Sequence, residues 1–280
     1  MSLDIKHDAK REPMVGVFDS GFGGLTVLRA LLSRIPSARY VYLGDTARLP
    51  YGAKSQATIA RYAVESARFL EERGCDYLVI ACNTATALAL EDIRQAVSVP
   101  VLGVIEPGAH AAKKNLKGPG GEVLILATAA TVQSHAYREA CAAFGLRGTE
   151  MACPLLVPLV EEGWTDHRVT REVLRIYLSE ALTRCAPQAV LLGCTHYPLI
   201  AGVIEETLRE LGSEAVIIDS AEATAEAASV ALGSAVGVSS EVNGPIFECF
   251  ATDSVEKFQR LGSLFLRRPI EHVHHLDLGG

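Results

Sequence analysis

One short pattern occurs twice in the sequence, and it limits what this chain can fold into. An apolar run ends on Cys82 in LVIACNTAT, and a second apolar run ends on Cys194 in VLLGCTHYP. A segment with helical character follows each cysteine, so each thiol is expected where a strand passes into the N-terminus of a helix. Free N–H groups and the helix dipole favour a negative charge there, either a thiolate or a bound carboxylate. Two cysteines in matching positions therefore suggest two matching acid–base groups.

Strand-like apolar runs alternate with helical segments along the chain, which is typical of an α/β fold with mainly parallel sheets. The spacing indicates an internal repeat. Asp19 precedes Cys82 by 63 positions, and Thr128 precedes Cys194 by 66. We therefore expect two related halves, each with a thiol at the end of an internal strand.

This repeat predicts two pseudo-symmetric α/β domains whose sheets face a central cleft. The first domain is expected to contain residues 14–104 and 217–270, and the second residues 105–216. Residues 1–13 are expected to form a flexible extension. Ligands of open α/β sheets bind beyond the C-terminal ends of the strands, so the cleft is the expected site.

Composition narrows the class of protein further. Hydrophobic residues make up 49% of the chain and charged residues 21%, as in a globular protein rather than a disordered one. The net charge of −7 argues against nucleic-acid binding, and no apolar run approaches the ~20 residues that span a bilayer. The N-terminus lacks the apolar region of a signal peptide, and seven cysteines without a tight framework suggest reduced thiols. We therefore expect a cytoplasmic protein.

Two thiols that face each other across a cleft suit one reaction in particular. One thiolate removes a proton from a carbon, and the opposite thiol delivers a proton to the other face, which inverts the stereocentre. A free cysteine has a pKa of about 8.5 and is mostly protonated at neutral pH, so neighbouring groups must tune each thiol. The candidates are Asp19 for the first cysteine and His196 for the second. Glu161, in an expected loop at residues 157–163, could orient His196.

The polar side chains around the cysteines fit a small carboxylate ligand. Four of them are expected at helix N-termini, where they bind carboxylates together with backbone N–H groups: Ser20, Asn83, Thr84 and Thr195. Tyr51 and Gly52 lie in a loop that could close over a second acidic group. No arginine stands in the strand-end motifs apart from Arg48, near Pro50, so dipoles rather than an ion pair are expected to hold the anion.

Six ordered motifs between about Val15 and about Leu266 resemble one family, the glutamate racemases. They are DSGFGGLTVLRAL, LGDTARLPYG, ACNTATALAL, TAATVQSHAY, VPLVEEG and LGCTHYP. The resemblance implies two α/β domains related by a pseudo-two-fold axis and an enzyme that interconverts L- and D-glutamate without a cofactor. It also implies that Cys82 acts on D-glutamate and Cys194 on L-glutamate.

The same resemblance assigns further residues and partners. Asp45 and Glu161 match positions thought to assist the chemistry. Substrate binding is implied for Asp19, Ser20, Pro50, Tyr51, Gly52, Asn83, Thr84, Thr128, Thr131, Thr195 and His196. No metal is implied. The family supplies D-glutamate for bacterial peptidoglycan, is usually dimeric, and includes members that a cell-wall precursor activates.

Other interpretations stay open at this point. A cysteine-nucleophile hydrolase or transferase would use Cys194 with His196 and leave Cys82 idle. A non-catalytic two-lobed protein could close around an acidic ligand, and a related racemase could act on aspartate or a hydantoin. A zinc site is disfavoured because no CxxC motif or second histidine pair accompanies Cys194 and His196. The other cysteines are interpreted as structural: Cys75, Cys141, Cys153, Cys185 and Cys249.

Overall fold

The computed structural model describes residues 12–116, 120–233 and 246–279, and its strands form two parallel sheets. Most of the expected N-terminal extension, residues 1–11, lies outside the described residues. The six-stranded sheet has the order β10-β9-β2-β1-β3-β4, with strands Met14–Asp19 (β1), Arg39–Gly44 (β2), Tyr77–Ile80 (β3), Val101–Gly103 (β4), Phe247–Ala251 (β9) and Val273–His275 (β10). The four-stranded sheet has the order β6-β5-β7-β8, with strands Glu122–Ala127 (β5), Arg147–Ala152 (β6), Ala189–Gly193 (β7) and Val216–Asp219 (β8). We call the part built on the six-stranded sheet the first lobe and the part built on the four-stranded sheet the second lobe.

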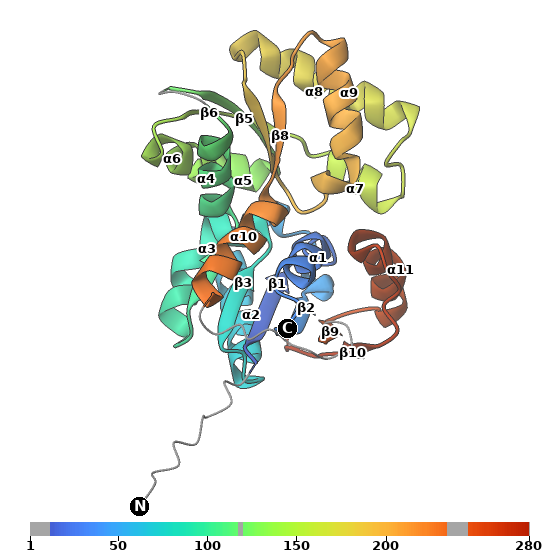
Figure 1. The fold of residues 1–280 in the computed structure, drawn as a ribbon. Coiled ribbons are helices and arrows are strands. Elements are labelled where there is room, and N and C mark those ends of the chain that lie inside the picture. The colour runs from blue at the N-terminus through green and yellow to red at the C-terminus, as the bar shows by residue number, and fades with distance from the viewer. Residues whose placement is uncertain (1–11, 117–119, 234–245, 280) are drawn as a thin grey trace, which may run out of the picture.

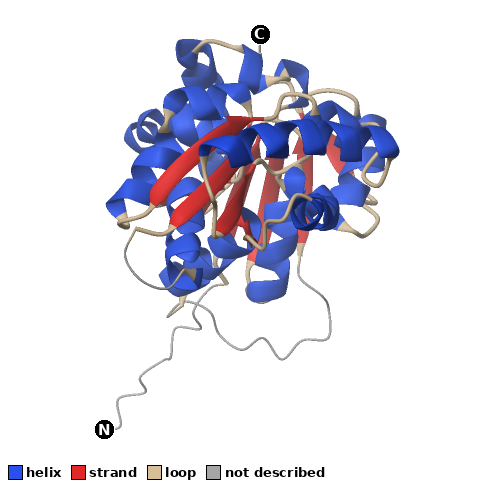
Figure 2. Ribbon diagram, turned by 90° about the horizontal axis from the view of Figure 1, so that it is seen from above, coloured by secondary structure: helices blue, strands red, loops and turns tan. Residues whose placement is uncertain are grey.

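Helices connect these strands and cover both faces of the sheets. In the first part of the chain they are Leu25–Arg34 (α1), Gln56–Glu72 (α2), Asn83–Ala96 (α3) and Ile105–Asn115 (α4), with short 3₁₀ helices at Thr46–Arg48 (η1) and Tyr51–Ala53 (η2). Further along they are Ala129–Ser134 (α5), Ala136–Ala143 (α6), Leu156–Glu161 (α7), Arg168–Arg184 (α8), Tyr197–Ile200 (η3), Ala201–Glu210 (α9), Ser220–Leu232 (α10) and Val255–Leu266 (α11). Figure 2 shows the strands between layers of helices. No helix in the described ranges is long and apolar enough to cross a membrane.

The two sheets repeat one strand order. The run β2-β1-β3-β4 of the first sheet has the same relative order as β6-β5-β7-β8 of the second. β9 and β10 extend the first sheet beyond this repeat, on the β2 side. Figure 1 shows the two sheets one above the other, with α10 against α1 and α4 where the lobes meet. The α/β class with two sets of parallel strands is therefore confirmed.

The position of β8 corrects the predicted division of the chain. Residues 217–219 were expected in the first domain, but β8 pairs with β7, with Ile217 opposite Val190 and Asp219 opposite Leu192. The reason is the repeat itself, because β8 occupies the place in the second sheet that β4 occupies in the first. The chain re-enters the first sheet only at β9, and β10 lies past the expected end at residue 270.

Strand β1, inside the first sheet, is buried on both faces, which fixes where its end points. In β1, Val15 and Val17 pack into one core cluster and Phe18 packs into another on the opposite face, as the two-residue period of a strand requires. The second cluster contains Ile59 and Ala63 of α2. Strands held between helices in this way give a firm support for the residues that follow their C-terminal ends.

Candidate active site

A cavity of about 510 Å³ lies at the C-terminal ends of strands from both sheets. Ser20 follows β1 and Cys82 follows β3, while Thr128 follows β5 and Cys194 follows β7. All four line the cavity, so each lobe contributes one thiol. The predicted site residues that line it are Ser20, Pro50, Tyr51, Gly52, Cys82, Asn83, Thr84, Thr128, Glu161, Cys194, Thr195 and His196. The cleft expected from the repeat is therefore present.

Cys82 caps the N-terminus of α3, as its sequence context predicts. Its Sγ accepts a hydrogen bond from the N–H of Ala85 at 3.4 Å and lies 3.5 Å from Oγ of Ser20. Burial raises the pKa of Cys82 to about 12, and the nearby Asp19 carboxylate acts in the same direction, while hydrogen bonds from Ser20 and Ala85 oppose it. Asp19 therefore favours the protonated thiol electrostatically, so it can assist ionisation only by accepting the proton.

Asp19 lies behind the cavity wall and does not line it. Its Oδ2 accepts a hydrogen bond from the N–H of Gly21 at 2.9 Å, and its buried Oδ1 has no hydrogen-bond partner among the described residues. Burial raises the pKa of Asp19, although the neighbouring His196 lowers it. A carboxyl group with a raised pKa and a free oxygen is a suitable proton acceptor.

Cys194 has a different neighbourhood, built on a histidine. Its Sγ lies 3.9 Å from Nδ1 of His196, and Nε2 of His196 lies 3.0 Å from Oε1 of Glu161. Burial alone would lower the pKa of His196, but its hydrogen bonds to Cys194 and Glu161 outweigh burial and raise this pKa to about 10. The imidazole is then an imidazolium at neutral pH, with Nδ1 toward the thiol of Cys194 and Nε2 toward the carboxylate of Glu161.

Glu161 reaches His196 from a helix rather than from the predicted loop. α7 spans Leu156–Glu161, and Pro158 lies in its first turn, where a missing N–H does not break the helix. The loop prediction for residues 157–163 was therefore wrong in its secondary structure. The predicted contact between Glu161 and His196 is present.

Hydroxyl groups from both lobes meet on the Cys82 side of the cavity. Oγ1 of Thr84 lies 3.0 Å from Oγ1 of Thr128 and 3.3 Å from Oγ1 of Thr131. Oγ1 of Thr128 also accepts the N–H of Thr131 at 3.4 Å and so caps α5. Thr131 is fully buried and does not line the cavity, so its place is in the contact between lobes.

Asp45 supports the wall instead of reaching the cavity. Its Oδ2 accepts a hydrogen bond from the hydroxyl of Tyr51 at 2.6 Å, and its Oδ1 accepts one from Thr252 at 3.0 Å. Arg48 forms an ion pair with the same carboxylate at 3.5 Å. Tyr51 lines the cavity while Asp45 does not, so Asp45 holds the segment Leu49–Gly52 in place.

Several lining residues were not predicted: Leu49, Ala53, Ala129, Cys153, Pro154, Val157, Pro158, Glu162 and Lys257. Lys257, on α11, is the only lysine or arginine among the described lining residues. It offers the cation that the strand-end motifs lack, and no motif near residue 257 indicates this role. Cys153, interpreted as structural, is a third thiol in the wall, although its Sγ donates to the carbonyl of Met151 at 3.6 Å.

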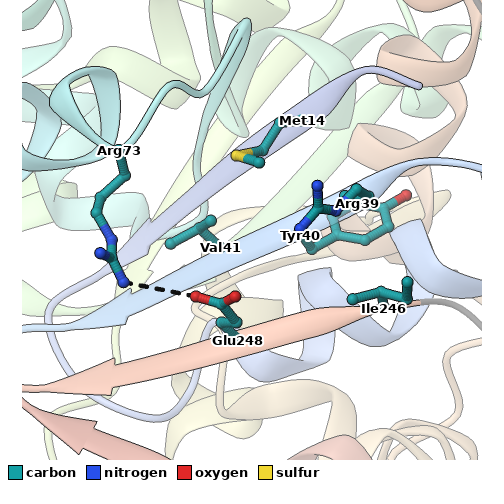
Figure 3. Close-up of a pocket in the computed structure, with 7 residues that line it drawn as sticks. All are labelled: Met14, Arg39, Tyr40, Val41, Arg73, Ile246 and Glu248. Atoms are coloured by element: carbon teal, nitrogen blue, oxygen red, sulfur yellow. Dashed lines mark hydrogen bonds and ion pairs between the residues drawn. The ribbon is translucent and has the colours of Figure 1, made fainter. Parts of the chain in front are cut away.

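A second hollow, of about 250 Å³, lies at the opposite ends of β1, β2 and β9 (Figure 3). Its charged groups include Arg39 and the ion pair of Arg73 with Glu248 at 3.5 Å. Its described lining contains no thiol or histidine, and its one hydroxyl belongs to the buried Tyr40, so it lacks the paired thiols of the first cavity. No group of three His, Cys, Asp or Glu suitable for a metal occurs in the described ranges.

Comparisons with known proteins identify the family of this chain. Residues 25–228 match the family model Asp/Glu/Hydantoin racemase. A glutamate racemase of Koribacter versatilis is 48% identical, over 97% of this chain and 100% of that protein. The crystal structure of a Francisella tularensis glutamate racemase with D-glutamate superposes with a TM-score of 0.85 at 32% identity, covering 96% of this chain and 98% of the other. An Escherichia coli glutamate racemase with L-glutamate and the activator UDP-MurNAc-Ala gives a TM-score of 0.75 at 28% identity, covering 96% and 100%.

Proposed function

The chain belongs to the Asp/Glu/hydantoin racemase family, and from this premise we propose that it interconverts L- and D-glutamate by proton transfer between Cα and the thiols of Cys82 and Cys194. Relatives that are 48% and 42% identical to it are glutamate racemases, so the enzyme is an isomerase. One observation carries the proposed mechanism, namely that the two thiols line one cavity from opposite lobes. No cofactor is needed for this chemistry.

On the Cys82 side, the thiolate takes the proton from Cα of D-glutamate. The C–H bond breaks as an S–H bond forms, and the electron pair stays on the substrate as a carbanion-like species. Because burial and Asp19 raise the pKa of Cys82, its thiolate is a strong base once formed. Asp19, with its unpartnered Oδ1, is the proposed acceptor of the thiol proton before the reaction.

On the Cys194 side, the thiol delivers its proton to the opposite face of Cα. The resulting thiolate is stabilised by the imidazolium of His196, which Glu161 holds by its contact to Nε2. In the reverse direction this thiolate removes the proton from L-glutamate, and Cys82 then supplies the proton. Each positioned acid or base contributes roughly 10²–10⁴ in rate.

Substrate binding is proposed for the polar groups between the thiols. Ser20, Asn83, Thr84 and Thr195 line the cavity near both thiols and offer hydroxyl or amide donors to the α-carboxylate. Tyr51, Gly52 and Lys257 lie in the wall for the second carboxylate. Thr128 shares the hydroxyl cluster with Thr84 and fixes it.

The test is incubation of the pure protein with each enantiomer of glutamate in D2O, without added cofactor. Loss of optical rotation together with deuterium at Cα supports the proposal. Cys82→Ala and Cys194→Ala should each abolish racemisation, because each removes the proton donor for one face. Cys185→Ala, a change of the same kind outside the cavity, should leave the rate within a few-fold of the parent.

Two results would overturn the proposal. No optical change with either enantiomer excludes glutamate racemisation, and glutamate binding without turnover would then indicate a binding protein. If Cys82→Ala keeps all of the catalytic activity of the protein, Cys82 is idle. That result would favour a hydrolase or transferase that uses Cys194 and His196 alone.

We further propose the biological setting that the family resemblance implies. D-glutamate made by this enzyme is expected to serve peptidoglycan synthesis in the cytoplasm, and the enzyme is expected to be a homodimer. The activator in the Escherichia coli structure suggests that a cell-wall precursor could act here too. Light scattering checks the dimer, and rates with and without UDP-MurNAc-Ala check activation.

A further inference from the structure

A buried hydrogen bond crosses between the lobes beside Cys82. Tyr137 lies on α6 of the second lobe, and Asn83 is the first residue of α3 in the first lobe. The hydroxyl of Tyr137 donates to Oδ1 of Asn83 at 2.5 Å. Both residues are buried, with exposures of 0% and 3%. This contact joins a residue outside the cavity to one that lines it.

The contacts of the two ends of the Asn83 amide show which way it faces. Its oxygen accepts from Tyr137, whereas its Nδ2 is buried and has no partner among the described residues. Burial raises the pKa of Tyr137, so its hydroxyl stays protonated and remains a donor. Nδ2 is therefore the free end of the amide.

A buried NH2 without an acceptor is unfavourable, so its retention beside a cavity indicates a ligand. We propose that Tyr137 is a positioning residue, which holds the Asn83 amide so that Nδ2 donates to the substrate carboxylate. This inference rests on the proposed function. Without the tyrosine hydroxyl the amide is free to turn by 180° and to present Oδ1, which repels a carboxylate.

The same contact makes substrate binding depend on how the lobes meet. Asn83 belongs to the first lobe and its orienting hydroxyl to the second, so the donor is set only while the lobes are in this arrangement. Thr26 makes the corresponding contact beside the other thiol, because its Oγ1 lies 3.1 Å from the carbonyl oxygen of Thr195. The residue after each cysteine is thus held by a hydroxyl of the opposite lobe.

The test is Tyr137→Phe, which removes one oxygen atom and keeps the ring. KM for both enantiomers should rise about ten-fold with little change in kcat, because the amide binds the ground state and the transition state alike. Tyr40→Phe is the matched control: its buried hydroxyl donates to the carbonyls of Leu31 and Ile35, away from the cavity. It should lower thermal stability without changing KM.

A double-substitution cycle separates positioning from general structural support. Asn83→Ala should raise KM, and adding Tyr137→Phe to it should raise KM no further. The inference is overturned if Tyr137→Phe raises KM by the same factor in the parent and in Asn83→Ala. It is also overturned if the KM of Tyr137→Phe equals that of Tyr40→Phe. Should Tyr137→Phe fail to fold, Asn83→Asp, which keeps the accepting oxygen and removes the NH2, must still raise KM.

These outcomes are distinct from failure of the proposed function. If the parent enzyme racemises glutamate and Tyr137→Phe matches it, only the positioning role falls. If the parent neither racemises nor binds glutamate, as measured by calorimetry, both fall, because the amide then has no glutamate carboxylate to bind.

Discussion

At the residue scale, the two thiols are alike in position and different in surroundings. Burial and the nearby carboxylate of Asp19 raise the pKa of Cys82, whereas Cys194 lies 3.9 Å from Nδ1 of His196. Cys82 thus has a carboxyl group as its acid–base neighbour, and Cys194 has a histidine. A two-base reaction needs one thiolate and one thiol at the start of each turnover, and the two cysteines exchange these roles between the two directions.

Glu161 is predicted to matter through His196. Glu161→Gln keeps the shape but removes the charge that supports the imidazolium, so kcat/KM should fall by about 10²-fold. The fall should be equal in both directions, because the two enantiomers have the same free energy in solution. Polarimetry with L- and D-glutamate measures it.

Glu162→Gln is the matched control for this change. Glu162 also lines the cavity, but no hydrogen bond joins it to His196 in the described structure. Its rate should stay within a few-fold of the parent. Equal losses in the two variants would mean that the general negative charge matters and not the contact to the histidine.

Stability should fall with rising pH because of His196. Burial lowers its pKa, but Cys194 and Glu161 raise it from 6.5 to about 10, so between these values the folded protein binds a proton that the unfolded chain releases. The stabilisation is complete below the unfolded value and is lost as the pH passes through the folded value. Urea unfolding at about pH 6, 8 and 10 measures this, and the loss should shrink in Glu161→Gln. An unchanged loss in that variant would contradict the assignment to His196.

At the element scale, α7 brings Glu161 to the cavity, and the chain leaves the helix through Gly163, which has a left-handed backbone. Gly163 has φ of +77°, and a Cβ there would meet nothing within 4 Å. Gly163→Ala should therefore cost about 1 kcal/mol in free energy of unfolding through backbone strain alone. Chemical denaturation measures the change.

Gly202, on α9, provides the control because its Cβ would also meet nothing, while its φ is not positive. Gly202→Ala should stabilise the protein by up to about 1 kcal/mol, since alanine is the better helix residue. The same sign of change at both glycines would rule out strain as the cause.

The elements near the cysteines were predictable, and those that complete the wall were not. Cys82 and Cys194 stand at the ends of apolar runs, so the local sequence alone placed both thiols at strand ends. Lys257 and Tyr137 depend on how α11 and α6 pack, and no local pattern encodes that packing. The helix at residues 156–161, predicted as a loop, has only six residues, which is too short for its sequence to show a helical period.

At the scale of the whole molecule, the lobes touch so closely that a single methyl group should separate them. A Cβ at Gly23, in the first lobe, would overlap Oγ1 of Thr195 and would stand 2.6 Å from the ring of His196 in the second lobe. Gly23→Ala should lower kcat/KM by about 10²-fold by displacing these groups, with the fold retained. Racemisation rates and circular dichroism test both parts.

Gly108→Ala is the control for this substitution. Gly108 lies in α4, and its Cβ would meet neighbouring atoms at ordinary distances of 3.4–3.6 Å. Its activity should match the parent. Equal activity in Gly23→Ala and Gly108→Ala would mean that the contact between the lobes accommodates a methyl group at residue 23.

The internal repeat was visible in the sequence because the corresponding motifs are similarly spaced in the two halves of the chain, although most of their residues differ. The assignment of residues 217–219 to the first domain was wrong. Spacing along the sequence does not show which strand β8 pairs with, and in the structure it pairs with β7. The strands β9 and β10 lie outside the repeat, so nothing in the first half of the chain predicted their edge position.

The repeated strand order has a consequence for chirality. A protein of L-amino acids cannot build walls that are mirror images, yet a racemase must accept two mirror-image ligands. Two similar lobes that face each other instead present the same kind of group to opposite faces of one carbon. The protein can then distinguish the two enantiomers only through residues that differ between the lobes. Here these are Thr84 on one side, His196 in the equivalent place on the other, and Lys257 from the part of the chain that has no counterpart.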